Sequence, residues 1–255
     1  MVKKTMKVVL LLAGRGRRLG ELTKSRHKSL LELLGRPLLG LLVEGFISCG
    51  LREFVSVLGY DKENVLKYIR DNFGKEINLI PVYNPRFEET NNLYSLWCAR
   101  KILSDDEFLV CNGDLVLDKS IIENLLDNDE VSAVAVDDSP RAAPIDSPGV
   151  IVRDNRIYDL GRHIPFEQSG GYAIGLYKFN RQLSSAFFYE ADKVLKNNIN
   201  AGFHDPLRAL FSRYANFVQS TEHLPWFDID VKEDITYAEK ILEGITHEQS
   251  KQLAS

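Results

Sequence analysis

The sequence predicts an α/β fold in which helices cover a mostly parallel sheet. Apolar runs typical of buried strands alternate with segments of helical periodicity through the first half of the chain. The first run, Lys7–Leu12, leads into a glycine-containing turn, and a helix is expected after it at Pro37–Cys49. This order of elements is typical of a parallel, doubly wound sheet. The chain has 255 residues, 44% of them hydrophobic, which is enough to build a large core.

Local signals support each element of the first half. Gly50 and Gly74 stand where two of the helices are expected to end. Val65, Ile69 and Phe73 recur at a spacing that places them on one helix face. Strands are expected at Lys7–Leu12, Glu53–Leu58, Ile77–Tyr83, Phe108–Cys111 and Val131–Val136, and helices at Pro37–Cys49, Lys62–Phe73, Asn91–Leu103 and Ser120–Leu126.

The second half of the chain has a different pattern. The segment 137–149 contains three prolines among acidic residues, which predicts a loop or lid. Asp154 and Asn155 indicate the turn of a hairpin. We interpret residues 1–245 as a single domain, with 137–180 as a mostly antiparallel insertion that faces the substrate and 246–255 as a polar tail. Further strands are expected at Gly171–Phe179, Phe217–Ser220 and Trp226–Asp230, and helices at Arg181–Leu195, Pro206–Tyr214 and about 233–243.

Composition and charge exclude several classes of protein. The net charge is −4 and basic residues are not in excess, so nucleic-acid binding is not indicated. No apolar stretch is long enough to cross a membrane, and the apolar start is too short for a signal peptide. Cys49, Cys98 and Cys111 lack the spacing of a metal site and are expected to be reduced thiols. We therefore expect a cytoplasmic protein with no nucleic-acid or membrane partner; a homodimer is left open.

The turn after the first strand carries the strongest chemical signal. Gly14 and Gly16 let the backbone turn tightly and bring N–H groups close to phosphate oxygens. A tight turn without a ligand explains this pair as well, and Leu19 stands where a dinucleotide-binding fingerprint needs glycine. A dense group of cations then favours a polyphosphate ligand: Arg17, Arg18, Lys24, Arg26 and Lys28.

Carboxylates at two distant places complement these cations. Asp114 follows the predicted strand Phe108–Cys111, at the sheet edge where ligands of such folds bind. Asp228 and Asp230 lie two residues apart in an extended segment, so both point to one face. Two like charges side by side are unfavourable unless a cation lies between them, which predicts a metal site. The alternatives are a turn aspartate at the first place and a helix cap at the second.

Two asparagines at the start of the predicted helix Asn91–Leu103 could form hydrogen bonds with a nucleotide base. Asn91 and Asn92 offer both donors and acceptors, which suits a cytosine edge, and Ser95 lies one turn further on. The simpler interpretation is that Asn91 caps the helix. Aromatic residues of the second half are expected in the core more often than in a cage for a quaternary ammonium: Phe166, Tyr172, Tyr177 and Trp226.

These motifs together resemble the nucleotidyltransferase family that makes nucleotide-diphospho compounds. Residues 11–19 read Leu-Leu-Ala-Gly-Arg-Gly-Arg-Arg-Leu, followed by Lys28-Ser29-Leu30 and Gly35-Arg36-Pro37-Leu38. The family pattern has a second alanine where Leu12 stands and a proline where His27 stands. The Asn-Asn-x-Tyr-Ser segment and Asp228-Ile229-Asp230 resemble the bacterial choline-phosphate cytidylyltransferases and related CTP-dependent enzymes.

The resemblance implies roles for individual residues. Arg18 and Lys28 would be catalytic and grip phosphates in the transition state. Asp114, Asp228 and Asp230 would bind Mg²⁺. The nucleotide would be bound by Leu12, Ala13, Gly14, Arg15, Gly16, Asn91, Asn92, Ser95 and Asn112.

The resemblance also implies a Rossmann-like three-layer α/β/α fold with a mixed, mostly parallel sheet. The implied reaction transfers CMP from CTP to a small phosphorylated or phosphonylated acceptor and releases pyrophosphate. Phosphocholine, aminoethylphosphonate, a phosphorylated amino-acid amide and inositol phosphate remain open as acceptors. The alternatives are a sugar-1-phosphate nucleotidyltransferase that uses dTTP, UTP or GTP, and a non-catalytic nucleotide-binding module.

Overall fold

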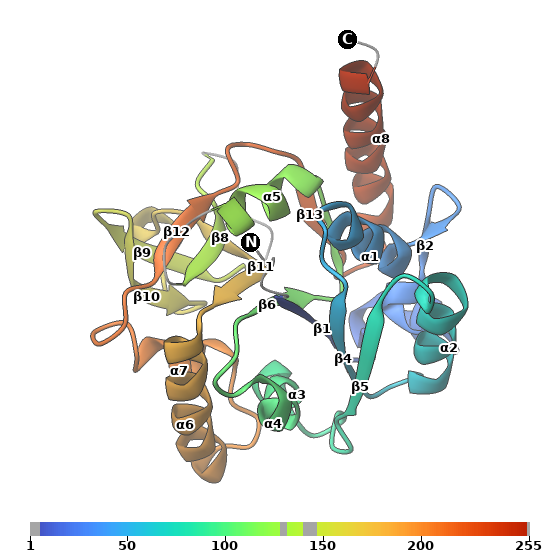
Figure 1. Cartoon of the computed structure of the whole chain (residues 1–255). Helices are drawn as coiled ribbons and strands as arrows, with labels where there is room; N and C mark the ends of the chain where they lie inside the picture. Colours follow the sequence, from blue (N-terminus) through green and yellow to red (C-terminus); the bar gives the residue numbers. More distant parts are fainter. Residues whose placement is uncertain (1–5, 128–131, 140–146, 254–255) are drawn as a thin grey trace.

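The computed structural model describes residues 6–127, 132–139 and 147–253. In these residues a nine-stranded sheet has the order β5-β4-β1-β6-β11-β8-β12-β10-β9 (Figure 1). Its strands are β1 (Lys7–Leu12), β4 (Glu53–Leu58), β5 (Asn78–Tyr83), β6 (Phe108–Asn112), β8 (Ala133–Asp137), β9 (Gly149–Arg153), β10 (Arg156–Gly161), β11 (Tyr172–Phe179) and β12 (Phe217–Ser220). Most of the proline-rich loop of the prediction, and Val131, lie outside the described residues.

The sheet has a parallel half and a mainly antiparallel half. Strands β5, β4, β1 and β6 pair in parallel, as their alternation with helices predicted. Strand β11 then pairs antiparallel with both β6 and β8, and β9 and β10 form the predicted hairpin. Asp154 and Asn155 turn this hairpin with φ of 49° and 61°, the left-handed values that a tight two-residue turn needs. The expected α/β fold with a mixed sheet is confirmed.

Two helical layers cover the sheet. Side chains alternate across β1: Val8 and Leu10 face one core, and Val9 faces the other. The first core includes α1 (Leu38–Ser48), α2 (Lys62–Phe73) and α5 (Lys119–Asp127). The second includes α3 (Asn92–Cys98), α4 (Arg100–Leu103), α6 (Arg181–Asn197) and α7 (His204–Arg208). The three-layer arrangement expected from the sequence is therefore confirmed.

A third apolar cluster joins residues 19–38 to Val116 and to residues 229–245. Leu242 and Ile245 of α8 (Asp234–Leu253) pack in one cluster with Leu33 of β2 (Glu32–Leu33) and Val116 of β7 (Leu115–Leu117). Strand β2 forms a small hairpin with β3 (Arg36–Pro37), and β7 pairs antiparallel with β13 (Trp226–Asp228). This cluster brings the segment after the glycine turn beside the acidic segment near residue 230.

Some element boundaries differ from the prediction. Helix α8 continues to Leu253, so residues 246–253 of the expected polar tail are helical, whereas the predicted helix ended at about residue 243. Figure 1 shows this helix projecting beyond the body of the molecule. The predicted helix Asn91–Leu103 is broken at Ala99, which separates α3 from α4. Within the described part, no helix combines the length and apolarity needed to cross a membrane.

Candidate active site

A pocket of about 300 Å³ opens at the carboxyl ends of β1 and β6. This edge of a parallel sheet is where α/β folds bind their ligands. The glycine turn, the start of α3, strand β11 and the segment after β13 contribute to its walls. Most of the predicted site residues line it: Ala13, Gly14, Arg18, Lys28, Asn91, Asn92, Ser95, Asn112, Asp114, Asp228 and Asp230.

The glycine turn is shaped by its neighbours. Gly16 has φ of +68°, and a Cβ atom there would lie 3.0 Å from Cβ of Lys28. The hydroxyl of Thr23 donates to the carbonyl oxygen of Gly16 at 2.9 Å. The amide of Tyr60 donates to the carbonyl oxygen of Ala13 at 3.0 Å. These two hydrogen bonds hold the turn in place. Position 16 requires glycine for two reasons: its φ is positive, and a Cβ atom would be too close to Lys28.

Three predicted nucleotide-binding residues do not line the pocket. Leu12 is 1% exposed and packs in the core between the sheet and α1, where it closely approaches Gly113. The guanidinium of Arg15 lies over the ring of Tyr60, 5.0 Å from its centroid. Gly16 lies against the aliphatic part of the Lys28 side chain. For Leu12 the reason is the pleat of β1, which points this side chain away from the pocket.

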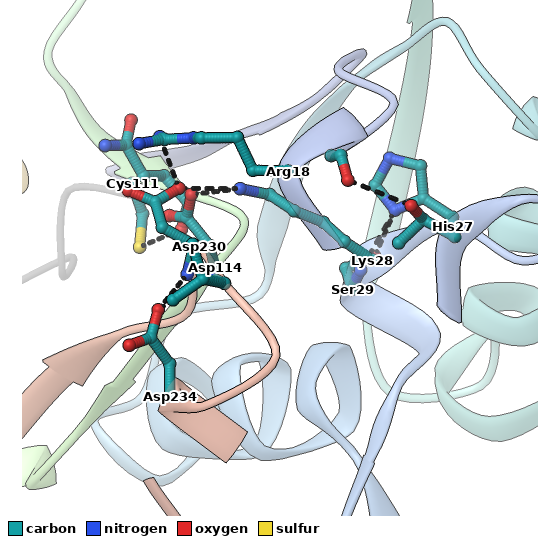
Figure 2. Close-up of polar contacts among 12 residues, drawn as sticks. Arg18, His27, Lys28, Ser29, Cys111, Asp114, Asp230 and Asp234 are labelled. Carbon is teal, nitrogen blue, oxygen red and sulfur yellow. Dashed lines mark hydrogen bonds and ion pairs between the residues drawn. The ribbon is translucent and has the colours of Figure 1, made fainter. Parts of the chain in front are cut away.

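Lys28 is the central cation of the pocket. It begins the short 3-10 helix η2 (Lys28–Leu30), and its ammonium donates to Oδ2 of Asp114 (Figure 2). It also lies 3.9 Å from Oδ1 of Asp230. Arg18, in the 3-10 helix η1 (Arg17–Thr23), approaches the same Oδ1 atom at 2.8 Å. The two predicted catalytic cations therefore meet two of the predicted metal-binding carboxylates.

Backbone pairing places these carboxylates. Strand β13 runs antiparallel to β7 with Asp228 opposite Leu115, and the amide of Ile229 donates to the carbonyl oxygen of Asp114 at 3.0 Å. The side chain of Asp234 then accepts from the amides of Asp230 and Val231, each at 2.7 Å, and holds the start of α8 (Figure 2). These bonds run back to the turn that precedes α8 and not to amides of the helix, so the predicted capping role of Asp230 stays a prediction.

The neighbouring carboxylates raise the pKa values of Asp228 and Lys28. Burial, followed by the charges of Asp114 and Asp230, raises the pKa of Asp228 to about 7. Burial by itself would lower the pKa of Lys28, but Asp114, then Asp230 and Asp228, raise it above its ordinary value. The ammonium therefore stays charged, while Asp228 is half protonated near neutrality.

The donor set suits a hard divalent cation. Oδ1 of Asp114 is buried and has no hydrogen-bond partner, which is costly for a carboxylate oxygen unless a cation binds it. Carboxylate oxygens are the ligands that Mg²⁺ prefers. However, among the described residues no three His, Cys, Asp or Glu side chains converge closely enough to hold a metal ion. Asp114, Asp228 and Asp230 share the pocket, where Lys28 pairs with Asp114 and Arg18 pairs with Asp230.

The polar residues of α3 have structural bonds in addition to their place on the pocket wall. Asn91 caps the helix, its side chain accepting from the amide of Asn92. Oδ1 of Asn92 accepts from the amide of Phe203 at 2.9 Å and so ties α3 to the segment before α7. The hydroxyl of Ser95 accepts from Asn84 at 3.0 Å. Base recognition by these three residues stays a prediction.

Comparison with known proteins identifies the family. Residues 8–175 match the MobA-like NTP transferase domain. The chain belongs to this family. The predicted class of enzyme, a nucleotidyltransferase, is thereby confirmed.

Relatives of the family resemble this chain over most of its length. A CTP:phosphoglutamine cytidylyltransferase from Campylobacter jejuni is 26% identical over 251 residues, covering 90% of this chain and 98% of that protein. A CMP-5'-(3-aminopropyl)phosphonate synthase from Streptomyces rubellomurinus is 29% identical over 250 residues, covering 88% of this chain. The chain spans only 37% of that longer protein. An inositol-1-phosphate CTP transferase structure from T. maritima superposes with a TM-score of 0.81 at 19% identity, covering 94% and 96% of the two chains.

The pocket of this family member contains residues that sequence reasoning did not assign. His27 lines it beside Lys28, and its Nδ1 accepts from the amide of Ser29 at 3.1 Å. Arg162 and His204 also line the pocket. The only signal for His27 was its departure from the family proline. The other two follow no local motif, and only the fold brings them to the pocket.

Proposed function

We propose that this protein transfers CMP from CTP to a small phosphorylated or phosphonylated acceptor and releases pyrophosphate. The observation that carries the proposal is the meeting of Lys28 and Arg18 with Asp114 and Asp230 beside a glycine turn. A polyphosphate needs fixed cations, and a divalent cation needs carboxylates. The names of relatives that align over most of the chain support CTP as the nucleotide and a phospho-acceptor as its partner.

The residues suggest how the chain assists the displacement. Amides of the turn at Gly14 would bind the phosphates that leave as pyrophosphate. Arg18 would neutralise the leaving group, and Lys28 would steady the α-phosphate. An oxygen of the acceptor attacks the α-phosphorus, and the bond to the pyrophosphate oxygen breaks. No covalent bond to the protein forms, so catalysis consists of positioning and charge stabilisation.

Asp114, Asp228 and Asp230 would hold Mg²⁺ when the nucleotide binds. The cation supplies charge that stabilises the developing phosphate oxygens. Binding by these residues would require Asp228 to be deprotonated. Oδ1 of Asp114 has no hydrogen-bond partner and would be open to the cation while Lys28 contacts Oδ2.

The test is a matrix of four nucleoside triphosphates against a panel of acceptors, with detection of pyrophosphate and of the joined product. The panel contains phosphocholine, phosphoethanolamine, phosphoserine, aminoethylphosphonate, inositol 1-phosphate and glucose 1-phosphate. We expect pyrophosphate only with CTP, Mg²⁺ and one class of non-sugar acceptor. Turnover of dTTP or UTP with glucose 1-phosphate would establish the sugar-nucleotide alternative instead. Nucleotide binding without pyrophosphate from any pair would favour a non-catalytic module.

A further inference from the structure

His27 and Ser29 form a turn around Lys28, the central cation of the pocket. Nδ1 of His27 accepts from the amide of Ser29 at 3.1 Å (Figure 2), and the carbonyl oxygen of His27 accepts from the amide of Leu30 at 2.9 Å. The first bond makes His27 the cap of η2, the short helix that Lys28 begins. The backbone on both sides of Lys28 is therefore held through His27.

Only one tautomer of the His27 ring fits this turn. The amide of Ser29 can only donate, so Nδ1 is the unprotonated nitrogen, and the proton of the neutral ring is on Nε2. The hydroxyl of Ser29 lies 2.8 Å from Nδ1 and donates to it as well. Burial, aided by the charge of Lys28 and opposed by that of Asp61, lowers the pKa of His27 to about 4. The ring is therefore neutral at pH 7, and Nδ1 remains an acceptor.

The ring of His27 is enclosed by its surroundings. It is 1% exposed, and it stacks on the ring of Tyr60 with centroids 6.5 Å apart. The carbonyl groups of Leu12 and Gly14 lie close enough to favour its protonated form and so oppose the fall in its pKa. Nε2 has no hydrogen-bond partner among the described residues, so the bonds of Nδ1 fix the orientation of the ring.

The main chain of His27 is fixed from the side of α2. Its amide donates to Oδ2 of Asp61 at 3.0 Å, and Oδ1 of Asp61 accepts from Nδ2 of Asn64 at 2.6 Å. His27 has φ of −64°, the angle to which the proline of the family pattern would be confined. In this chain, hydrogen bonds hold the angle that a proline ring would fix.

The position of Lys28 leaves little room for displacement. A Cβ atom at Gly16 would lie 3.0 Å from both Cβ and Cδ of Lys28, so the aliphatic part of this side chain already passes close to the glycine turn. At its other end, the ammonium donates to Asp114 and lies 3.9 Å from Oδ1 of Asp230. A backbone shift would press the side chain against the turn or draw the ammonium from these carboxylates. A misplacement of about 1 Å can cost on the order of 100-fold in rate.

We propose that His27 is a positioning residue for Lys28: through Nδ1 it fixes the turn at residues 27–29 and so directs the ammonium toward the triphosphate. The inference rests on the proposed function, in which Lys28 steadies the α-phosphate. His27 acts through the amide of Ser29 and not on the reacting atoms. This role needs an acceptor at the δ position of residue 27, but it does not need an imidazole.

The experiment compares His27→Asn with His27→Leu. Oδ1 of asparagine takes the place of Nδ1 and can accept from the amide two residues further on, whereas leucine has no acceptor. Both variants lose the packing on Tyr60 and should unfold at a lower temperature than wild type. With saturating CTP, we expect kcat to fall about 10–100-fold in His27→Leu and to stay within about threefold of wild type in His27→Asn.

His223→Asn is the matched control, because it makes the same change in an exposed histidine. It should leave both kcat and the unfolding temperature unchanged. Equal losses of kcat in His27→Asn and His27→Leu, or near-native kcat in His27→Leu, would overturn the proposal.

Calorimetric titration with inorganic tripolyphosphate and Mg²⁺ tests the position of Lys28 without turnover. We expect binding to weaken roughly 10-fold in both His27→Leu and Lys28→Met and to be kept in His27→Asn, since one charged hydrogen bond has about this value. This order would support the proposal even if no pair of nucleotide and acceptor gave pyrophosphate, a result that defeats only the proposed function.

Nitrogen-15 NMR of the histidine rings provides a test on the wild-type chain. The ring signals that disappear in His27→Asn belong to His27. At pH 7 they should show a proton on Nε2 and none on Nδ1. A proton on Nδ1 would contradict the bond from Ser29 and overturn the proposal, whether or not the variants fold.

Discussion

Nζ of Lys28 donates a hydrogen bond to Oδ2 of Asp114, a carboxylate 86 residues further along the chain. The ammonium thus lies against one of the carboxylates that would hold Mg²⁺. It compensates a buried negative charge in the free protein and lines the pocket in which we propose that the triphosphate binds. This contact links the stability of the pocket to its chemistry.

Removing either member of this pair should greatly reduce turnover. We expect Lys28→Met and Asp114→Asn each to lower kcat on the order of 10²–10³, since each removes a preorganised charge. Pyrophosphate release under saturating CTP measures the effect. Lys67→Met is the control, because Lys67 is exposed on α2 and pairs with Asp71. Near-native turnover in either variant would show that its role is assigned wrongly.

The raised pKa of Asp228 makes folding stability depend on pH. Its pKa of about 7 exceeds the ordinary value of 3.8, so the folded chain keeps a proton that the unfolded chain loses between these values. Stability therefore falls as pH rises through this window. We expect Asp228→Asn to be more stable than wild type by roughly 2–4 kcal/mol at pH 8 and nearly equal to it at pH 4. Urea unfolding without divalent cations measures this, and a difference independent of pH would contradict it.

Gly16 should be much less tolerant than a glycine in open space. Alanine at position 16 must adopt φ near +68° and press on the stem of Lys28. We expect Gly16→Ala to destabilise the fold by about 1–3 kcal/mol and to reduce turnover. Gly244→Ala, where no atom lies within 4 Å of a Cβ, should instead be neutral or stabilise the exposed face of α8. Thermal unfolding compares the two, and equal effects would refute the steric argument.

Two histidines should destabilise the fold in acid. Burial, aided by neighbouring cations, lowers the pKa of both His27 and His204 from 6.5 to about 4. The unfolded chain therefore binds more protons, and the stability present above pH 6.5 is lost as pH falls toward 4. We expect a loss of roughly 2 kcal/mol from each histidine between pH 7 and pH 5. Denaturant unfolding of His204→Gln should show a smaller loss than wild type, whereas His247→Gln, at an exposed position, should match wild type.

Much of the fold could be predicted because its signals are local. The apolar run of β1 and the spacing of Val65, Ile69 and Phe73 in α2 follow from strand and helix periodicity. Helix α8 was predicted too short, because its last turns lack an apolar stripe although the backbone bonds continue. The antiparallel insertion of β11 beside β6 is a long-range pairing that no local pattern specifies.

By itself, the sequence determined which chemical groups this protein brings to its pocket: the glycine turn, the cations Arg18 and Lys28, and the acids Asp114, Asp228 and Asp230. The tertiary structure alone decided how they meet. The β7–β13 pairing and the apolar cluster around α8 bring the acids to the cations, and the pleat of β1 turns Leu12 into the core. The same fold brings Arg162 and His204 to the wall of this pocket. The type of each residue can be read from the sequence. Residues far apart in the chain come close together only when the core packs.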